Sequence, residues 1–443
     1  MIELLRAATA HAPDHLAVVT PTRRLTYGEL TAAAEAAAGA LRERSVERLA
    51  VLDPDPATIW TLLAAGSLAG VEVCVYPVAV SDEEVAQFRA KFGHDVLVTP
   101  RALPGQHVLH PAELAGTPLT GAPPTERPVL ILTSGTSGPA KGARHDWGRL
   151  LRMAAGVRPT PEHRWLLAYG PNQFGGFQIL LHVAAAGATL VAGDSFRPRD
   201  GLAAMRRHGV THASGTPTFW RFLLAELRAD GDPAPALEQI TLSGEAVPGP
   251  LLDRLRAQFP DARISQIFGA TEMGQTITVR DGRPGLPAEF LDAPGDVSFR
   301  IVDGELHVRT TAAMLGYHGE KSSALEWRPT GDLVELIGDR IHFRGRKTEV
   351  INVGGVKVHP LPIEERVGGI PGIAVAQAFG RPNPMVGQIV ALEVVPDSGA
   401  DEDALRAQIR AACADLPPAA RPRSITFVPA LTTTGNKLAR GGR

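Results

Sequence analysis

Short apolar, β-prone runs alternate with helical patterns from the start of the chain to about Glu272, and this alternation constrains the fold more than any other feature. Such alternation predicts a largely parallel sheet with helices packed on its faces. The strand candidates are Val129–Leu132, Trp165–Tyr169, Ala188–Ala192, Gln239–Leu242 and Ile264–Phe268. The helix-like stretches lie at about 145–155, 174–186, 200–208, 217–229 and 250–259, and a capping box, Thr26-Tyr-Gly-Glu29, opens a helix to about Arg44. The expected fold class is a layered α/β domain with ligands at the carboxyl ends of its strands.

After about Asp296 the pattern changes to that of antiparallel hairpins. We expect Val297–Val302 and Glu305–Arg309 to pair around Asp303-Gly304, and Leu333–Ile337 and Arg340–Phe343 to pair around Gly338-Asp339. Beyond Gly345 follows a small α+β segment, with helices near 360–367 and 402–414 and strands near 373–379 and 388–395. We therefore predict one domain over residues 1–345, with a β-rich part at about 296–345, and a small C-terminal domain over 346–443.

The composition argues against several classes of partner and binding site, but it does not identify the function. The 443 residues carry a formal net charge of −2, so the charge balance favours neither a nucleic-acid nor a membrane partner. Cys74 and Cys413 are too few for a disulfide framework or a cysteine metal site. The N-terminus lacks the pattern of a signal peptide, and no apolar run is long enough to cross a membrane. We expect a soluble, cytoplasmic protein.

Residues 131–142 read Ile-Leu-Thr-Ser-Gly-Thr-Ser-Gly-Pro-Ala-Lys-Gly, an apolar strand that ends in a loop rich in hydroxyls and glycines. Glycines let backbone N–H groups approach an anion, hydroxyls add donors, and a lysine adds a compensating charge. The loop therefore suits the triphosphate of ATP, with an ordinary polar turn as the alternative. Its candidate ligands are Thr133, Ser134, Gly135, Thr136, Ser137, Gly138 and Lys141. A GTPase-type loop is not indicated, because Gly-Lys-Ser/Thr before a helix is missing.

Five further motifs follow this loop along the chain. They are Ser243-Gly-Glu-Ala246, Phe268-Gly-Ala-Thr-Glu272, Thr330-Gly-Asp332, Gly345-Arg346 with Gly354-Gly355, and Lys437-Leu-Ala-Arg440. In this order, the six motifs resemble those of the adenylate-forming superfamily, which comprises acyl- and aryl-CoA synthetases, peptide-synthetase adenylation domains and luciferases. The resemblance covers nearly the whole chain. It implies a large adenylation domain and a small, mobile C-terminal domain that carries a catalytic lysine.

The resemblance implies a nucleotide site at the ends of the strands. Phe268 would lie against adenine, Thr271 would contact phosphate, and Glu272 would hold Mg²⁺, which takes its other ligands from water and substrate phosphates. A core phenylalanine and a helix-start glutamate are the ordinary alternatives. The other residues implied for ATP or AMP are Gly244, Glu245, Ala246, Gly269 and Ala270.

Three charged residues complete the implied adenylation site. Asp332 would accept hydrogen bonds from both ribose hydroxyls, each of roughly 1.5–3 kcal/mol, and Arg346 would help to hold ribose or phosphate. Lys437 would stabilise the negative charge that develops when the acid attacks the α-phosphate. Each residue taken alone would fit a turn, a linker surface or a solvated tail equally well.

The segment after Arg346 resembles that of CoA ligases, in which the small domain rotates between adenylation and thioester formation. Gly354 and Gly355 would line the CoA tunnel in the second state, and Thr348 would be the hinge. Relatives usually have Asp or Lys at the hinge, so Thr348 is a departure. Asn436 stands where Gly commonly precedes the lysine, and Asn also tolerates left-handed backbone.

The acid pocket departs further from the family pattern, because many relatives carry a histidine where this chain has Pro171-Asn-Gln-Phe-Gly-Gly176. We expect Gln173 or Phe174 to occupy that place, and loops at Gly175-Gly176 and Gly269 to admit a flat ring near the backbone. The resemblance leaves the acid itself undetermined and favours a small or aromatic one.

The leading hypothesis is an acid–CoA ligase that uses ATP, Mg²⁺ and CoA. The carboxylic acid would become an acyl-adenylate with release of pyrophosphate, and a thiol would then displace AMP. Alternatives are transfer to an acyl carrier protein in trans, transfer to an amine, activation of nitrite to diazotise an aryl amine, or a nucleotide-binding module without catalysis. A homodimer is also possible, as in many family members.

Overall fold

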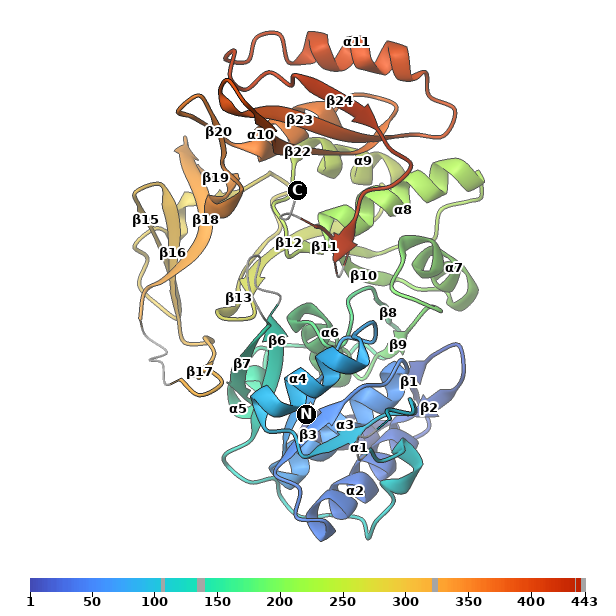
Figure 1. Cartoon of the computed structure of the whole chain (residues 1–443). Coiled ribbons are helices and arrows are strands. Elements are labelled where there is room, and N and C mark those ends of the chain that lie inside the picture. The colour runs from blue at the N-terminus through green and yellow to red at the C-terminus, as the bar shows by residue number, and fades with distance from the viewer. Residues whose placement is uncertain (105–107, 134–139, 321–325, 435, 440–443) are drawn as a thin grey trace.

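In the computed structural model, the described residues are 1–443 except for 105–107, 134–139, 321–325, 435 and 440–443. Figure 1 shows the N-terminal residues at one end of the molecule and the C-terminal sheet at the other, with a β-rich unit at the side. The last described residues return from the C-terminal sheet toward the middle of the molecule. No described helix has the length and apolarity that a bilayer span requires.

The first of two large sheets has eight strands in the order β13-β12-β11-β10-β8-β9-β1-β2. Its six inner strands are parallel, and the edge strands β13 and β2 run antiparallel to their neighbours. The strands are β1 (Leu16–Val19), β2 (Arg24–Thr26), β8 (Arg164–Leu167), β9 (Thr189–Val191), β10 (His212–Gly215), β11 (Gln239–Ser243), β12 (Arg263–Ala270) and β13 (Gly274–Val279). All strands predicted between residues 165 and 268 belong to this sheet.

The second large sheet has six strands in the order β17-β7-β6-β4-β3-β5. They are β3 (Arg48–Val51), β4 (Glu72–Val75), β5 (Val96–Val98), β6 (Pro128–Thr133), β7 (Lys141–Asp146) and β17 (Gly316–Tyr317). The sequence predicted an α/β domain without dividing it into two sheets, because pairing between distant strands leaves no local signal. It also predicted helix from about 145, where β7 continues to Asp146 through its pairing with β6.

Helices separate and cover the two sheets. One core joins both sheets to α1 (Ile2–His11), α2 (Tyr27–Glu43), α3 (Pro56–Ala69) and α6 (Phe174–Ala186). A second core lies under α7 (Pro198–His208), α8 (Pro217–Asp230) and α9 (Gly249–Gln258), and a third lies under α4 (Asp82–Phe92). Along β8, Trp165 and Leu167 face the first core while Leu166 faces the second, as the two-residue period of a strand requires. The layers are therefore helix, sheet, helix, sheet, helix.

Two short helical elements complete this region, α5 (Trp147–Arg152) and η1 (Pro111–Glu113). The predicted capping box at Thr26 is confirmed, since its side chain accepts a hydrogen bond from Glu29 N and the Glu29 side chain accepts one from Thr26 N. Tyr76 is fully buried in the core under α4.

The β-rich unit is a five-stranded antiparallel sheet, in the order β14-β19-β18-β16-β15. Its elements are β14 (Leu286–Pro287), η2 (Ala288–Phe290), β15 (Val297–Val302), β16 (Glu305–Thr310), β18 (Arg328–Ile337) and β19 (Arg340–Arg346). Both predicted hairpins are confirmed, and Asp303 and Gly304 have the positive φ values, 50° and 77°, that a two-residue turn between twisted strands favours. Asp332 lies within β18 opposite Arg346.

The C-terminal region has its own sheet and core. Strands β20 (Ile351–Val353), β21 (Val356–Val358), β22 (Ile373–Asn383), β23 (Gly387–Pro396) and β24 (Ser424–Phe427) pack against α10 (Pro360–Gly368) and α11 (Glu402–Ala412). The helix η3 (Lys347–Glu349) connects this sheet to β19, and β25 (Thr433–Thr434) pairs with β26 (Lys437–Leu438) near the end of the chain. The boundary that we predict at residue 346 falls at the end of β19 and stays a prediction.

Candidate adenylation site

The candidate nucleotide-binding residues lie at the carboxyl ends of two neighbouring parallel strands of the first sheet. Gly244, Glu245 and Ala246 follow β11, and Phe268, Gly269 and Ala270 form the end of its neighbour β12. Phe268 is half-buried, with its ring centroid 5.7 Å from that of Phe299 and 5.5 Å from that of Phe343. It is therefore packed on one side by the β-rich unit.

The end of the chain lies against the residues that follow β11. Asn436 Nδ2 donates to the carbonyl oxygens of Ala168 and Phe196, at 2.9 and 2.7 Å. Asn436 has a φ of 61°, the left-handed conformation that the sequence analysis expected asparagine to tolerate. Leu438 N donates to Glu245 Oε1 at 3.3 Å. The loop that carries Lys437 is thus held from both sides of the lysine.

Lys437 approaches Gly244 so closely that a Cβ atom at Gly244 would lie 2.9 Å from Lys437 Cε and 3.1 Å from Nζ. Lys437 as a whole keeps an exposed surface, but protein atoms crowded around its ammonium group lower its pKa through desolvation. The carboxylates of Glu245, Asp332 and Glu272 act in the opposite direction, and Arg346 adds to the lowering. The structure therefore brings these predicted charged residues into one electrostatic neighbourhood.

Glu245 is already occupied by protein donors. Its Oε2 accepts from Thr218 N at 3.0 Å and its Oε1 from Thr218 Oγ1 at 3.0 Å, at the first turn of α8. Together with the bond from Leu438 N, these contacts suit a residue that positions the lysine loop. The role of Glu245 in binding ATP stays a prediction.

Asp332 and Arg346 face one another across β18 and β19. Arg346 Nε lies 3.0 Å from Asp332 Oδ1, and Arg346 Nη1 donates to Thr330 O at 2.8 Å. Burial raises the pKa of Asp332, and the positive charge of Arg346 opposes that rise. The pair presents a carboxylate next to a guanidinium, as a ribose and phosphate site needs.

Glu272 lies in the turn between β12 and β13. Tyr317 contacts Glu272 and His145 contacts the preceding Thr271, and the sequence analysis identified neither. Tyr317 donates its hydroxyl to Glu272 Oε1 at 3.1 Å, and Lys141 Nζ lies 4.8 Å from the centre of the Tyr317 ring. Among the described residues, no hydrogen bond reaches Glu272 Oε2, so this oxygen fits a divalent cation. His145, fully buried, lies with Nε2 2.7 Å from Thr271 O. Tyr317 and His145 meet the site only through tertiary packing, so no local pattern signals them.

The phosphate loop itself is only partly described. Thr133 and Lys141 are partners at the ends of β6 and β7. The candidate ligands Ser134, Gly135, Thr136, Ser137 and Gly138 lie outside the described residues, as does Arg440.

The predicted acid-pocket residues occupy different surroundings from those expected. Gly175 and Gly176 lie in the first turn of α6, not in a loop, and a Cβ at Gly176 would lie 2.3 Å from Gly170 O. Gly269 belongs to β12, where a Cβ would lie 2.7 Å from Gly274 O. Close backbone packing therefore explains the glycines at 176 and 269. Gln173 accepts from Gly170 N, and the ring of Phe174 lies 5.6 Å from that of His145. Their role in the pocket stays a prediction.

The Gly354-Gly355 pair forms the turn between β20 and β21, with φ values of 58° and 89°. Gly354 N donates to Val386 O, and no described atom lies within 4 Å of a Cβ position at Gly355. In this structure Lys437 lies against Gly244, the residue that follows β11. Thr348 lies in η3, and its role as a hinge stays a prediction.

Family models agree with this arrangement. The model described as AMP-binding enzyme matches residues 5–318, and the model for the AMP-binding enzyme C-terminal domain matches residues 362–437. The chain therefore belongs to the AMP-binding enzyme family, the adenylate-forming superfamily that its motifs resemble. It is an AMP-forming ligase of the acyl- and aryl-CoA synthetase type.

Similar proteins span the whole chain. A feruloyl-CoA synthase of Amycolatopsis sp is 28% identical, with 97% of this chain and 95% of that protein covered. A 2-succinylbenzoate–CoA ligase of Bacillus subtilis (strain 168) is 25% identical, with 85% and 84% covered. The crystal structure of the anthranilate CoA ligase AuaEII with anthranoyl-AMP is similar with a TM-score of 0.87, 21% identity and coverage of 99% and 95%. The last likeness confirms the predicted fold class of a large α/β domain with a small C-terminal domain.

Proposed function

We propose that the protein is an ATP-dependent aryl-CoA ligase. The observation that carries this proposal is the contact of Lys437 with Gly244, where the charges of Glu272, Asp332 and Arg346 also act on the lysine. The similarity to enzymes named as feruloyl- and 2-succinylbenzoate-CoA ligases supports an aromatic acid and CoA as substrates.

In the first half-reaction, a carboxylate oxygen of the acid attacks the α-phosphorus of ATP, and pyrophosphate leaves with the electrons of the broken P–O bond. Lys437 directs its ammonium group at the charge that develops there. Asp332 accepts the ribose hydroxyls, and Arg346 holds that carboxylate in place and opposes the rise in its pKa that burial causes. Glu272, held by Tyr317, supplies a carboxylate oxygen for Mg²⁺, which when bound neutralises charge on the phosphates.

In the second half-reaction, the thiolate of CoA attacks the acyl carbon of the adenylate, a C–S bond forms and AMP leaves. The Gly354-Gly355 turn would line the CoA path after the small domain rotates about Thr348. Among the described residues, the atoms within 4 Å of a Cβ position at Gly354 belong to Val386, and none lies within 4 Å of such a position at Gly355, so this turn has room for a ligand.

A phosphopantetheine on a carrier protein is the second candidate acceptor. It rests on 26% identity over 92% of the chain to a medium/long-chain-fatty-acid–[acyl-carrier-protein] ligase of Mycobacterium tuberculosis. The comparisons do not favour an amine or nitrite in its place. The cytoplasmic location and the homodimer stay predictions.

Mass spectrometry of reactions with Mg·ATP and a panel of aryl and aliphatic acids, with and without CoA, tests the proposal. We expect aryl-CoA products and AMP. Substitution Lys437→Ala should slow pyrophosphate release on the order of 10²–10³-fold, while conversion of a supplied aryl-adenylate to its CoA ester persists. A Lys437→Ala enzyme as active as the parent in pyrophosphate release would remove the lysine from the mechanism. Adenylates that never become CoA esters would favour the carrier protein.

A further inference from the structure

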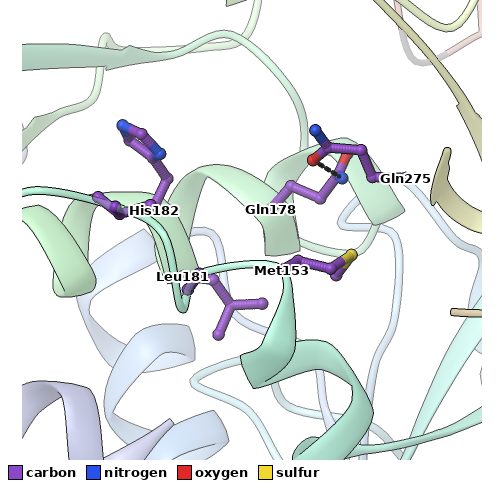
Figure 2. A pocket seen from close by; sticks show the side chains of 7 residues that line it. Met153, Gln178, Leu181, His182 and Gln275 are labelled. Atoms are coloured by element: carbon purple, nitrogen blue, oxygen red, sulfur yellow. Dashed lines mark hydrogen bonds between the residues drawn. The ribbon is translucent and has the colours of Figure 1, made fainter. Parts of the chain in front are cut away.

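A small pocket lies between α6, β13 and the segment after α5 (Figure 2). Its volume is about 40 Å³, enough for a substituent of a few atoms and too small for an alkyl chain. Met153 and Leu181 contribute apolar atoms, whereas Gln178, His182 and Gln275 contribute polar groups. No residue of the candidate adenylation site lines it directly.

The polar side of the pocket consists of two amides in contact. Gln178 Nε2 donates to Gln275 Oε1 at 2.9 Å (Figure 2). Gln275 Nε2 in turn donates to Thr278 Oγ1 at 3.2 Å. Within the described part of the chain, Gln178 Oε1 accepts no hydrogen bond. Desolvation lowers the pKa of His182 to about 4, so its imidazole is neutral at physiological pH. The pocket therefore offers Gln178 Oε1 as an unused acceptor, beside the second N–H of each amide, and carries no positive charge of its own.

The position of the two amides connects them to the candidate site. Gln275 is paired with Gly269, next to Phe268, and lies three residues beyond Glu272, just past the turn that joins β12 to β13. Gln178 lies one helical turn after Phe174 on α6. An acid whose carboxylate reacts near Glu272 and whose ring extends along β13 would end at these amides.

We propose that Gln178 and Gln275 select an aryl acid that carries a hydroxyl or amino group on the part of the ring remote from its carboxylate. This inference rests on the proposed aryl-CoA ligase function and specifies its substrate class. A donor on the ring satisfies Gln178 Oε1, whereas an unsubstituted ring covers that oxygen and leaves it unpaired. A site that hydrogen-bonds a group of its substrate strongly rejects analogues that lack this group. An apolar pocket rejects analogues with an added group less strongly.

The test measures pyrophosphate release with benzoate and cinnamate and with their ring-hydroxylated and ring-aminated derivatives. For the parent enzyme, we expect the best donor-bearing acid to exceed its unsubstituted analogue in kcat/KM by about tenfold or more. In Gln178→Met and Gln275→Met, which keep the side-chain length and lose the amide, this ratio should fall toward one, mainly through KM. Gln258→Met, at the exposed end of α9, serves as the matched control for replacing a glutamine by methionine and should keep the parent ratio.

The possible results distinguish the proposed role of Gln178 and Gln275 from the proposed ligase function. A parent enzyme that releases pyrophosphate with aryl acids but ranks them equally, or variants that keep the parent ratio, would overturn the role of the amides and leave the ligase proposal intact. A parent enzyme that adenylates none of the aryl acids would overturn both. A folded Gln178→Met variant that loses all activity with both kinds of acid would indicate a structural role and would also overturn the selection.

Discussion

At the scale of single residues, Gly244 is the position where the backbone and the proposed catalytic lysine are most tightly coupled. Its φ of 85° disfavours a side chain, and a Cβ there would meet Lys437 Cε and Nζ at 2.9 and 3.1 Å. A methyl group can be accommodated only if the lysine moves. Because a displaced cation no longer faces the α-phosphate, the chemical step should suffer more than nucleotide binding.

We therefore expect Gly244→Ala to slow adenylation by about 10–100-fold, with a smaller change in the KM for ATP. Gly304→Ala is the matched control, because Gly304 has a similar φ of 77° in a hairpin turn and no atom within 4 Å of its Cβ position. Both variants should lose about 1–2 kcal/mol of unfolding free energy from backbone strain. Pyrophosphate release and thermal melting separate these effects, and equal adenylation rates in the two variants would contradict the coupling.

At the scale of elements, η3 is the connection that has to change if the C-terminal domain rotates. Thr348, at its centre, is the proposed hinge. Proline at this position fixes φ near −65°, which fits the helical turn seen here and resists another conformation. We expect Thr348→Pro to retain adenylation and to slow thioester formation at least tenfold.

Single-turnover measurements of adenylate formation and of its conversion by CoA test this expectation, with Thr348→Ala as the control that leaves φ free. If Thr348→Pro slows neither step, the pivot lies elsewhere. If it slows adenylation alone, η3 shapes the state seen here and does not act as a hinge.

The elements also show which parts of this fold the sequence could predict. The capping box at Thr26 and the Asp303-Gly304 turn were predictable because a few adjacent residues determine them. Strand β7 was not, since Lys141–Asp146 is largely polar and becomes a strand through pairing with β6, which buries His145. The division into two sheets likewise depends on distant pairings, such as that of β1 with β9.

In the candidate site, too, local motifs predict some residues, whereas tertiary packing alone brings in others. Motif residues such as Lys437, Asp332 and Glu272 were predictable because their spacing resembles a known family. Tyr317 was not, because its contact with Glu272 joins residues 45 positions apart and no short motif encodes it. Gly175 and Gly176 show the reverse error. The helix predicted over 174–186 is right, but the acid-pocket interpretation placed these two glycines in a loop, whereas α6 uses Gly176 for close packing against Gly170.

At the scale of the whole molecule, buried histidines should make stability depend on pH. Desolvation lowers the pKa of His94 and of His145 to about 4 and that of His212 to about 3, from an ordinary value of 6.5. All three side chains are buried. Below pH 6.5 the unfolded chain binds protons that the folded chain excludes, so the unfolding free energy falls as pH falls from 6.5 toward 4.

Glu365 acts in the opposite direction, because burial raises its pKa to about 7 from 4.5 and its folded form holds a proton that the unfolded form releases. These three histidines, together with His182, whose pKa is also lowered to about 4, outweigh it, and the net loss should reach roughly 3.5 kcal/mol per pH unit near pH 5.5. We expect the melting temperature to fall by several degrees between pH 7.5 and 5.5.

His94→Asn retains a polar partner for the Tyr76 hydroxyl, which bonds His94 Nδ1 at 2.8 Å, and should flatten this dependence by about one third. His11→Asn, at the exposed end of α1, should leave it unchanged. A melting temperature independent of pH over this interval, or equal slopes for the two variants, would show that buried histidines do not set the acid limit of this fold.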